Sequence, residues 1–266
     1  MIPEAMGWYA QSLSKYNILP NCVNREIFFK EPVLKKYLRP FTLSSIKGLG
    51  YIMDRISFAS RQYHFFRSVA TLDLKQVPQS PSRLEELSEF RKVFNAKFYD
   101  MMTGYDLVID VDAEQIQEAF GAAWKLKDVY DRFKLPYYLI YSGSKGFHLT
   151  IEWQDIQAAI ETTPTGFVKM AQAIIKGLSK ETGLKYEKGG SLDTIYDNRR
   201  VIRVPYSIHP TTNRVCLPLS DQDFESFKEK KCEIKHVLNS VKLFNRGNLK
   251  RPNSAQNIKG FVECYA

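Results

Sequence analysis

A short run at residues 106–112, DLVIDVD, is the strongest indicator of fold in this chain. Its last four residues alternate between apolar and acidic, which is the period of a β-strand. Asp110 and Asp112 would then lie on one face, with Ile109 and Val111 pointing into a core. Two carboxylates this close repel each other, and a divalent cation, which prefers oxygen ligands, relieves the repulsion. The run predicts metal ligands on a rigid strand, although taken alone it fits a solvated strand face better.

Hydrophobic periodicity and turn residues predict the elements around this strand. We expect strands at residues 106–112, 137–143, 146–153, 199–207 and 215–219, and helices at 116–133, 163–183 and 221–240. Another helix is expected to begin near Ser80-Pro81, where an N-cap residue precedes a proline. From residue 104 the order is β-α-β-β-α-β-β-α, a mixed α+β pattern in which helices cover one face of a sheet.

The composition is that of an ordinary globular protein, with 44% hydrophobic and 25% charged residues. A chain of 266 residues can bury one large core, or two smaller units that share an interface. No apolar run approaches the roughly 20 residues that span a bilayer, and the N-terminus lacks the pattern of a secretory signal. We therefore expect a cytoplasmic protein without a membrane partner, whose four scattered cysteines are reduced.

A second element of interest is the turn at residues 142–148, SGSKGFH, between two of the predicted strands. Gly143 and Gly146 allow backbone N–H groups to converge on an anion, as in a phosphate-binding nest. Further donors come from the side chains of Ser142, Ser144, Lys145 and His148. Alternation places His148 on the polar face of its strand, which is not the position of a core histidine. An ordinary hairpin with a flexible Gly-Ser loop explains the same residues equally well.

A third element combines Asp193 with a basic stretch at residues 199–209, RRVIRVPYSIH. Strict alternation would give this stretch a polar face with Arg203, Ser207 and His209, and a buried face opposite. Arg203 and His209 are suited to grip a triphosphate or a template backbone. The proline within the stretch restricts it to an edge or irregular strand, and basic edge strands are often only protective.

The net charge of +9 favours a polyanionic partner, and nucleic acid over a membrane surface. Basic residues are concentrated in residues 228–251, which suits a region that follows template phosphates with salt-sensitive affinity. Contacts to nucleic acid are expected at Arg200, Arg214, Lys228 and Lys235.

Together these three elements resemble the archaeo-eukaryotic primase superfamily, especially the small catalytic subunit of archaeal and eukaryotic primases. Residues 108–112 match the family's motif of two aspartates alternating with hydrophobic residues. Residues 142–148 match its S-G-x-x-G-x-H motif with the correct spacing. Asp193 and then residues 203–209 match its third aspartate and the basic-x-P-x-S-x-H strand that follows. The resemblance spans most of the chain.

The fold implied by this resemblance is α+β, with an RNA-recognition-motif-like catalytic sheet interlocked with an N-terminal α/β unit. We expect one primase-polymerase catalytic domain over residues 1–266, with the N-terminal unit at 1–103, the catalytic unit at 104–240 and a basic C-terminal segment at 241–266. The N-terminal half agrees more loosely, at residues 24–29 and 54–58, which look like the segments in which such subunits begin.

The activity implied by the resemblance is template-dependent nucleotidyl transfer by a DNA primase or primase-polymerase, which makes primers or extends strands from nucleoside triphosphates. Asp110, Asp112 and Asp193 would hold Mg²⁺ or Mn²⁺, as a pair of ions. Nucleotide contacts are expected at Tyr138, Ser142, Gly143, Ser144, Lys145, Gly146, His148, Arg203, Ser207 and His209. Single-stranded DNA is the expected template, and a helicase or other replication or defence modules are further expected partners.

Tyr138 belongs to this set because alternation along residues 137–142 places it on the same face as Ser142. Its phenol is then suited to stack on the sugar of the nucleotide or to bond to a 2′-hydroxyl. Packing under a covering helix is the simpler alternative.

Three features depart from the family pattern. Ser144 stands where many replicative primases carry a basic residue, so phosphate contacts would rest more on Lys145. The spacing from Asp193 to Arg203 is shorter than in archaeal small subunits, which leaves Asp197 as a rival third metal ligand. The cysteine-rich zinc stem of many relatives has no counterpart. These differences favour a self-standing primase-polymerase from a mobile element or a defence system, with a CRISPR-associated enzyme as a further alternative.

Two other classes of function stay open at this point. A non-catalytic nucleic-acid-binding module would read bases with exposed aromatic residues, whereas the face in question carries carboxylates. A metal-dependent nuclease also uses paired aspartates, but the Gly-Ser-Lys-Gly turn and Arg203 favour a triphosphate substrate. Priming and extension, and ribonucleotides and deoxynucleotides, remain alternatives as well.

Overall fold

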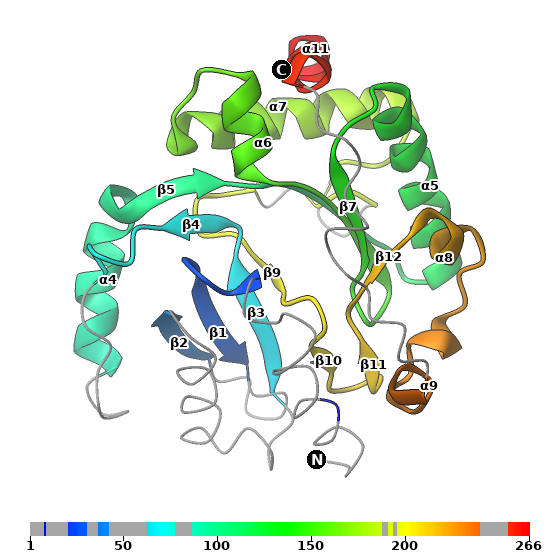
Figure 1. The fold of residues 1–266 in the computed structure, drawn as a ribbon, viewed down its shortest axis with the longest axis horizontal. Helices are drawn as coiled ribbons and strands as arrows, with labels where there is room; N and C mark the ends of the chain where they lie inside the picture. Colours follow the sequence, from blue (N-terminus) through cyan, green and yellow to red (C-terminus); the bar gives the residue numbers. More distant parts are fainter. Residues whose placement is uncertain are drawn as a thin grey trace. The chain divides into compact units, whose positions relative to one another are not determined.

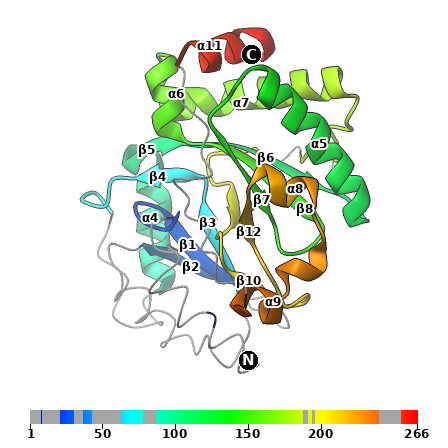
Figure 2. The ribbon, with the colours of Figure 1, turned by 45° about the vertical axis from the view of Figure 1, so that its right-hand side comes forward.

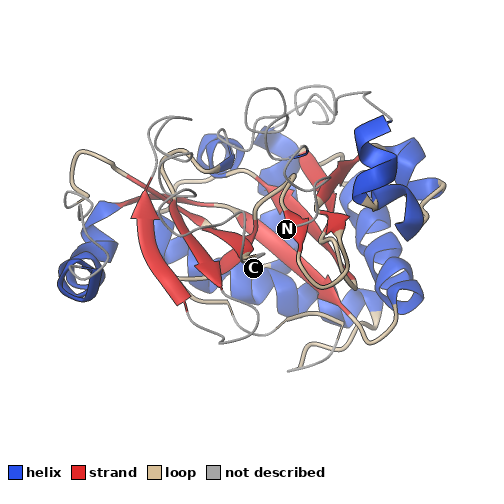
Figure 3. Ribbon diagram, turned by 90° about the horizontal axis from the view of Figure 1, so that it is seen from below, coloured by secondary structure: helices blue, strands red, loops and turns tan. Residues whose placement is uncertain are grey.

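A computed structural model of the chain describes residues 8, 21–30, 37–42, 63–77, 87–187, 191–193, 196–239 and 255–266. The chain divides into two compact units, both of which combine helices and strands. Figure 3 shows the helices and strands of the described residues. The first unit comprises Met1–Thr103, Val201–Cys216 and Lys228–Leu243, and the second comprises Gly104–Arg200, Leu217–Phe227 and Phe244–Ala266. The domain ranges expected from the sequence stay predictions. Segments after residue 200 alternate between the two units.

The second unit is built on a four-stranded antiparallel sheet with the order β12-β7-β8-β6 (Figure 2). Its strands are β6 (Leu107–Asp112), β7 (Tyr137–Tyr141), β8 (Gly146–Ile151) and β12 (Leu217–Leu219). The register of β6 and β8 places Asp110 directly opposite His148 and Asp112 opposite Gly146. Ile109 and Val111 are buried, as the alternation predicted. Asp110 and Asp112 therefore lie at the end of β6, whose position is fixed by its pairing with β8.

The helices of the second unit are α5 (Ile116–Arg132), α6 (Trp153–Ala159), α7 (Pro164–Thr182), α8 (Asp221–Glu225) and α11 (Ala255–Tyr265). α5 packs against β6 and β8, and α11 packs against α6 and α7 (Figure 1). The Thr163 hydroxyl accepts a hydrogen bond from the Gly166 N–H at the start of α7. Gly183 ends the same helix with φ 67°, a left-handed conformation that glycine adopts without strain.

The first unit contains a four-stranded sheet with the order β2-β1-β3-β9. Its strands are β1 (Glu26–Lys30), β2 (Tyr37–Thr42), β3 (His64–Ser68) and β9 (Val201–Arg203). The unit also holds β4 (Ala70–Leu72), which pairs with the start of β5 (Met102–Tyr105), and the pair β10 (Ile208–His209) and β11 (Arg214–Val215). Its helices are α4 (Leu87–Met101), α9 (Ile234–Asn239) and the 3₁₀ helix η3 (Glu229–Cys232). Phe29, Phe65 and Phe94 are fully buried in its core.

The predicted strand at residues 199–207 is wrong in its length and its partner. Only β9 is extended, and it pairs with β3, whereas β12 pairs with β7. Pro205 has no N–H to continue a ladder, and the Ser207 hydroxyl donates to the Val204 carbonyl at 2.6 Å, which favours a turn. Tyr206 in that turn has φ 69°. The expected alternation of polar and buried residues therefore stops at Arg203.

Two further elements differ from the prediction. Trp153 begins α6 and does not extend the strand before it. The single helix expected at 221–240 is divided into α8, η3 and α9, because Lys228 and Glu233 have extended backbones. Glu233 instead forms a β-bridge with Arg214. The expected helix start at Ser80-Pro81 lies outside the described residues, and so do residues 54–58.

No helix in the part of the chain that the structure describes is long and apolar enough to cross a membrane. The four cysteines are free thiols, three of them buried.

Candidate active site

The candidate site lies at the end of β6, within the second unit. Asp110 faces His148 across the sheet, and the Nε2 atom of His148 lies 3.4 Å from Oδ1 of Asp110. The face of β8 that the sequence indicated as polar is buried, since His148 is 4% and Thr150 1% exposed. The prediction that His148 is not an interior histidine is thus corrected. Its polar partner is the carboxylate of Asp110, whose side chain is 21% exposed.

Asp112 is crowded by charge at the end of the same strand. The residue as a whole is exposed, but its carboxylate packs against Gly146, where a Cβ atom would collide with it and with the Val111 carbonyl. Burial of the carboxyl, followed by the charge of Asp110, raises the pKa of Asp112 to about 6. A cation beside these two carboxylates would relieve that unfavourable charge.

Asp193 reaches the other two aspartates through backbone pairing. Leu192 forms an antiparallel bridge with Val111, and the Asp193 N–H donates to the Asp110 carbonyl at 3.4 Å. This bridge brings a segment from far along the chain beside the end of β6. The three aspartates named from the sequence therefore lie together, and their roles stay predictions.

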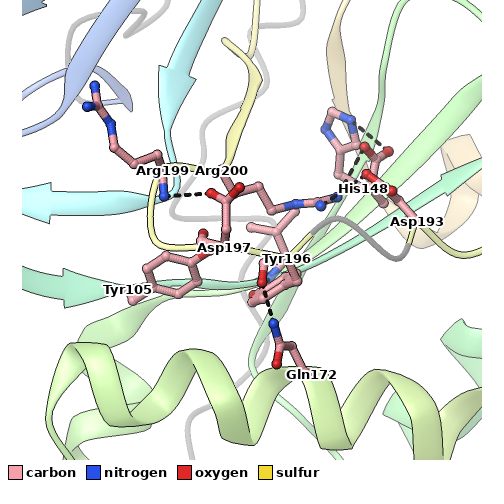
Figure 4. Close-up of polar contacts among 10 residues, drawn as sticks. Tyr105, His148, Gln172, Asp193, Tyr196, Asp197, Arg199 and Arg200 are labelled. Atoms are coloured by element: carbon pink, nitrogen blue, oxygen red, sulfur yellow. Dashed lines mark hydrogen bonds and ion pairs between the residues drawn. The ribbon is translucent and has the colours of Figure 1, made fainter. Parts of the chain in front are cut away.

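Arg200 lies between two of these carboxylates. Its Nη1 donates to Asp193 Oδ2 at 3.1 Å, and its Nη2 lies 3.4 Å from Asp110 Oδ2. Figure 4 shows the Arg200 side chain extended towards Asp193, next to His148. The side chain is only 5% exposed, so the contact to nucleic acid that we expected from Arg200 would require it to move.

Asp197, the rival third ligand, is engaged in a turn. Its carboxylate accepts the Arg199 N–H at 2.7 Å, and its carbonyl accepts the Arg200 N–H at 3.1 Å. The Tyr105 hydroxyl also donates to the Asp197 carbonyl. These contacts favour a structural role for Asp197 and leave Asp193 as the better candidate ligand.

The turn at residues 142–148 is closed by its own first residue. The Ser142 hydroxyl accepts the N–H of Gly146 at 3.2 Å and that of Ser144 at 3.4 Å. Gly143 has φ 85°, which explains why glycine occupies this position. Lys145 is exposed at the tip of the turn, so its ammonium is accessible to an anion. Tyr138 is buried at 6% exposure, which fits the packing alternative as well as a sugar contact.

The remaining predicted nucleotide ligands belong to the first unit, together with a histidine that sequence reasoning missed. Arg203 Nη2 lies 2.9 Å from Nδ1 of His64, and the His64 and His209 rings are 5.0 Å apart. The Arg203 guanidinium also lies 5.0 Å from the ring centroid of Phe66. No local pattern in the sequence distinguishes His64, because its partner lies 139 residues away.

Both histidines of this cluster are held neutral. Burial, followed by the charge of Arg203, lowers the pKa of His64 to about 4 and that of His209 to about 3. Ser207, also predicted to bind nucleotide, uses its hydroxyl within the turn described above. The cluster combines a fixed positive charge with two neutral imidazoles, which is a suitable environment for an anion.

Three other basic residues were expected to contact nucleic acid. Arg214 forms an ion pair with Glu229, and the Lys235 ammonium lies 3.1 Å from Glu233. Lys228 is exposed. Much of the basic region that begins here lies outside the described residues, so its role stays a prediction.

The donor set at the end of β6 suits a divalent metal in its chemistry, because three carboxylates supply hard oxygen ligands. Within the ranges that the structure describes, no group of three or more His, Cys, Asp or Glu side chains is arranged tightly enough to hold an ion. Two of the carboxylates converge on the Arg200 guanidinium. Metal binding here would therefore require a rearrangement of side chains.

The chain is similar to known proteins in sequence and in fold. No protein-family model matches the chain. The DNA primase small subunit of Pyrobaculum islandicum is 25% identical over an alignment of 230 residues, and the match covers 63% of this chain and 72% of that protein. The polymerase domain of Mycobacterium tuberculosis ligase D, in complex with DNA, matches with a TM-score of 0.57 and 14% identity, over 93% of this chain and 92% of that chain. The catalytic domain of primase RepB′ in complex with initiator DNA has a TM-score of 0.40 and 9% identity, over 90% and 94% of the two chains.

The chain has a fold of the primase-polymerase type, in which helices are combined with antiparallel sheets. With the primase relative, this fold confirms the resemblance to archaeo-eukaryotic primases that was seen in the motifs. The RNA-recognition-motif-like character of the sheet stays an expectation.

Proposed function

We propose that this protein is a template-dependent nucleotidyltransferase, a primase or primase-polymerase that makes or extends strands from nucleoside triphosphates. The observation that carries the proposal is that three aspartates from two distant segments lie close together beside a glycine-rich turn. Asp193 donates its N–H to Asp110, and His148, which ends the turn, faces the same aspartate. The primase and polymerase relatives support the same class of reaction.

Asp110, Asp112 and Asp193 would hold the metal ions. Divalent ions bound there would activate a 3′-hydroxyl and neutralise the leaving pyrophosphate. The raised pKa of Asp112 supports this assignment, because a carboxylate crowded by a neighbouring negative charge gains most from a cation.

The turn at residues 142–148 would bind the phosphates of the incoming nucleotide, with Lys145 as the charged donor at its tip. In the first unit, Arg203 is assigned to the triphosphate, with His64 and His209 as its neighbours. A DNA template is proposed because the polymerase domain of ligase D is solved in complex with DNA and this chain carries a net charge of +9.

A single assay separates this function from its alternatives. The protein is incubated with Mn²⁺, labelled nucleoside triphosphates and an unprimed single strand, and in parallel with a primed template. Short labelled products are expected on one or both substrates. Shortening of an end-labelled template would indicate a nuclease, and binding without either reaction would indicate a non-catalytic module.

Aspartate variants test the assignment of the site. Asp110→Asn and Asp193→Asn should abolish nucleotidyl transfer, whereas Asp197→Asn should retain it if Asp197 only closes its turn. Full activity in Asp110→Asn would contradict the metal assignment. Loss in Asp197→Asn with an intact fold and an active Asp193→Asn would exchange the roles of these two residues.

A further inference from the structure

The side chain of Arg200 contacts two of the three carboxylates that the proposed metal site would use. Its guanidinium contacts Oδ2 of Asp193 and Oδ2 of Asp110, at 3.1 and 3.4 Å. Its side chain is 5% exposed, and its Cζ lies 5.1 Å from the ring centroid of Tyr196. Two of the three carboxylates thus share one fixed positive charge.

The placement of Arg200 is built into the backbone of the preceding turn. Asp197 accepts the N–H groups of both Arg199 and Arg200, and this fixes the direction in which the two side chains leave the chain. In Figure 4, Arg200 extends towards Asp193, and the Arg199 side chain points away from it. Exposed ion pairs add little stability, but a buried arginine depends strongly on its carboxylate partners. The contact of Arg200 with Asp110 and Asp193 is therefore an interaction of a buried side chain and not of a mobile surface residue.

A divalent ion bound by Asp110 and Asp193 would share these two carboxylates with the guanidinium, which contacts one oxygen atom of each. A dication and a guanidinium within a few ångströms of each other also repel strongly in a poorly solvated site. Simultaneous binding of both cations by these carboxylates is therefore unfavourable. This accounts for the finding that the carboxylates converge on Arg200 and not on a common point.

We propose that Arg200 is a built-in counter-ion of the carboxylate site, which competes with the divalent metal for Asp110 and Asp193 and leaves them when the metal binds. This inference rests on the proposed function, which assigns the metal to these residues. Arg200 in this role keeps the carboxylates together and charge-balanced before the metal arrives. It thereby lowers the affinity of the protein for the metal alone.

The alternative hypothesis is that Arg200 only positions Asp193 for the metal. The two hypotheses predict opposite effects on metal affinity when the Arg200 side chain is removed. If Arg200 competes, a variant without the guanidinium binds metal more tightly. If Arg200 positions Asp193, the same variant binds metal more weakly, because the carboxylates repel and separate.

The experiment is a titration of the metal-free protein with Mn²⁺ in the absence of nucleotide and DNA, in which free Mn²⁺ is measured by electron paramagnetic resonance. Arg200→Ala should bind Mn²⁺ about tenfold or more tightly than the wild type, as expected when one or two charge-assisted hydrogen bonds no longer oppose binding. Arg200→Lys should be intermediate, since a single ammonium lacks the fork that spans two carboxylates. Arg199→Ala is the matched control, with the same charge removed one residue away, and should bind Mn²⁺ as the wild type does.

Unchanged or weaker Mn²⁺ binding in Arg200→Ala would overturn the inference. If circular dichroism shows that Arg200→Ala is unfolded, Arg200→Lys decides in the same way. Failure of the proposed function is distinguishable from failure of this inference. Tighter Mn²⁺ binding by the Arg200 variants, together with no nucleotidyl transfer by the wild type, would overturn the proposed function alone. If neither the wild type nor any variant binds Mn²⁺, both the proposed function and this inference are overturned.

Discussion

His148 and Asp110 face each other across β8 and β6, with Nε2 of the imidazole 3.4 Å from a carboxylate oxygen. Because the histidine is buried, its contact with Asp110 is shielded from water and stronger than a surface pair. The pairing connects the glycine-rich turn to the carboxylates. An anion bound at the turn and a cation bound at the aspartates would therefore influence each other through His148.

Replacement of His148 should affect both catalysis and nucleotide binding. We expect His148→Ala to lower the rate of nucleotidyl transfer by roughly 10- to 100-fold, as for the loss of one charge-assisted hydrogen bond. Lys145→Ala, at the exposed tip of the turn, should mainly raise the KM for nucleotide. Steady-state kinetics with varied nucleotide separates the two effects. Equal weakening of DNA binding by both variants would indicate a template role instead.

Gly146 is expected to tolerate no side chain. A Cβ atom there would collide with the Asp112 carboxylate and the Val111 carbonyl, so Gly146→Ala should destabilise the protein by about 2 kcal/mol and weaken Mn²⁺ binding. Gly121→Ala in α5 is the matched control, because its Cβ would meet nothing within 4 Å. That variant should be as stable as the wild type or slightly more so. Urea unfolding measures both, and equal stability of the two variants would contradict the prediction.

The neutral histidines of the first unit predict a loss of stability in mild acid. In the folded protein the pKa of His64 is about 4, below the ordinary value of 6.5. As the pH falls from 6.5 towards 4, the unfolded chain takes up a proton that the folded protein does not, so stability decreases. His64→Gln removes this contribution. The wild type should lose about 2 kcal/mol more than His64→Gln between neutral pH and pH 4, a value reduced because the residue is partly exposed. Parallel pH profiles of unfolding free energy in the two proteins would show that His64 is not held neutral.

Tyr138 tests how the site would distinguish sugars. If its hydroxyl contacts the 2′-hydroxyl of the incoming nucleotide, Tyr138→Phe should change the ratio of ribonucleotide to deoxynucleotide incorporation and leave the dependence on metal unchanged. Competition between the two nucleotide types on one template provides the measurement. An unaltered ratio would leave Tyr138 as a packing residue, in agreement with its burial.

Elements with a strong local signal were predicted well from the sequence. The strand at Leu107–Asp112 follows from alternation, and α7 follows from the Thr163-Pro164 start and the Gly183 stop. Each of these signals acts over a few residues, so the sequence contains it in full. The prediction for the stretch after Arg203 was wrong. Polar and apolar residues continue to alternate there in the sequence, but Pro205 and the Ser207 hydroxyl impose a turn.

Strand period and turn chemistry are local, so the aspartates at the end of β6 and the glycine-rich turn between β7 and β8 could be predicted from the sequence alone. Tertiary structure alone decided that His148 is buried against Asp110, that Arg200 joins Asp110 and Asp193, and that His64 pairs with Arg203. The contacts of Arg200 with Asp110 and of Arg203 with His64 span 90 and 139 residues. The order and register of the strands set such contacts, and no periodicity along the chain encodes which distant side chains will meet.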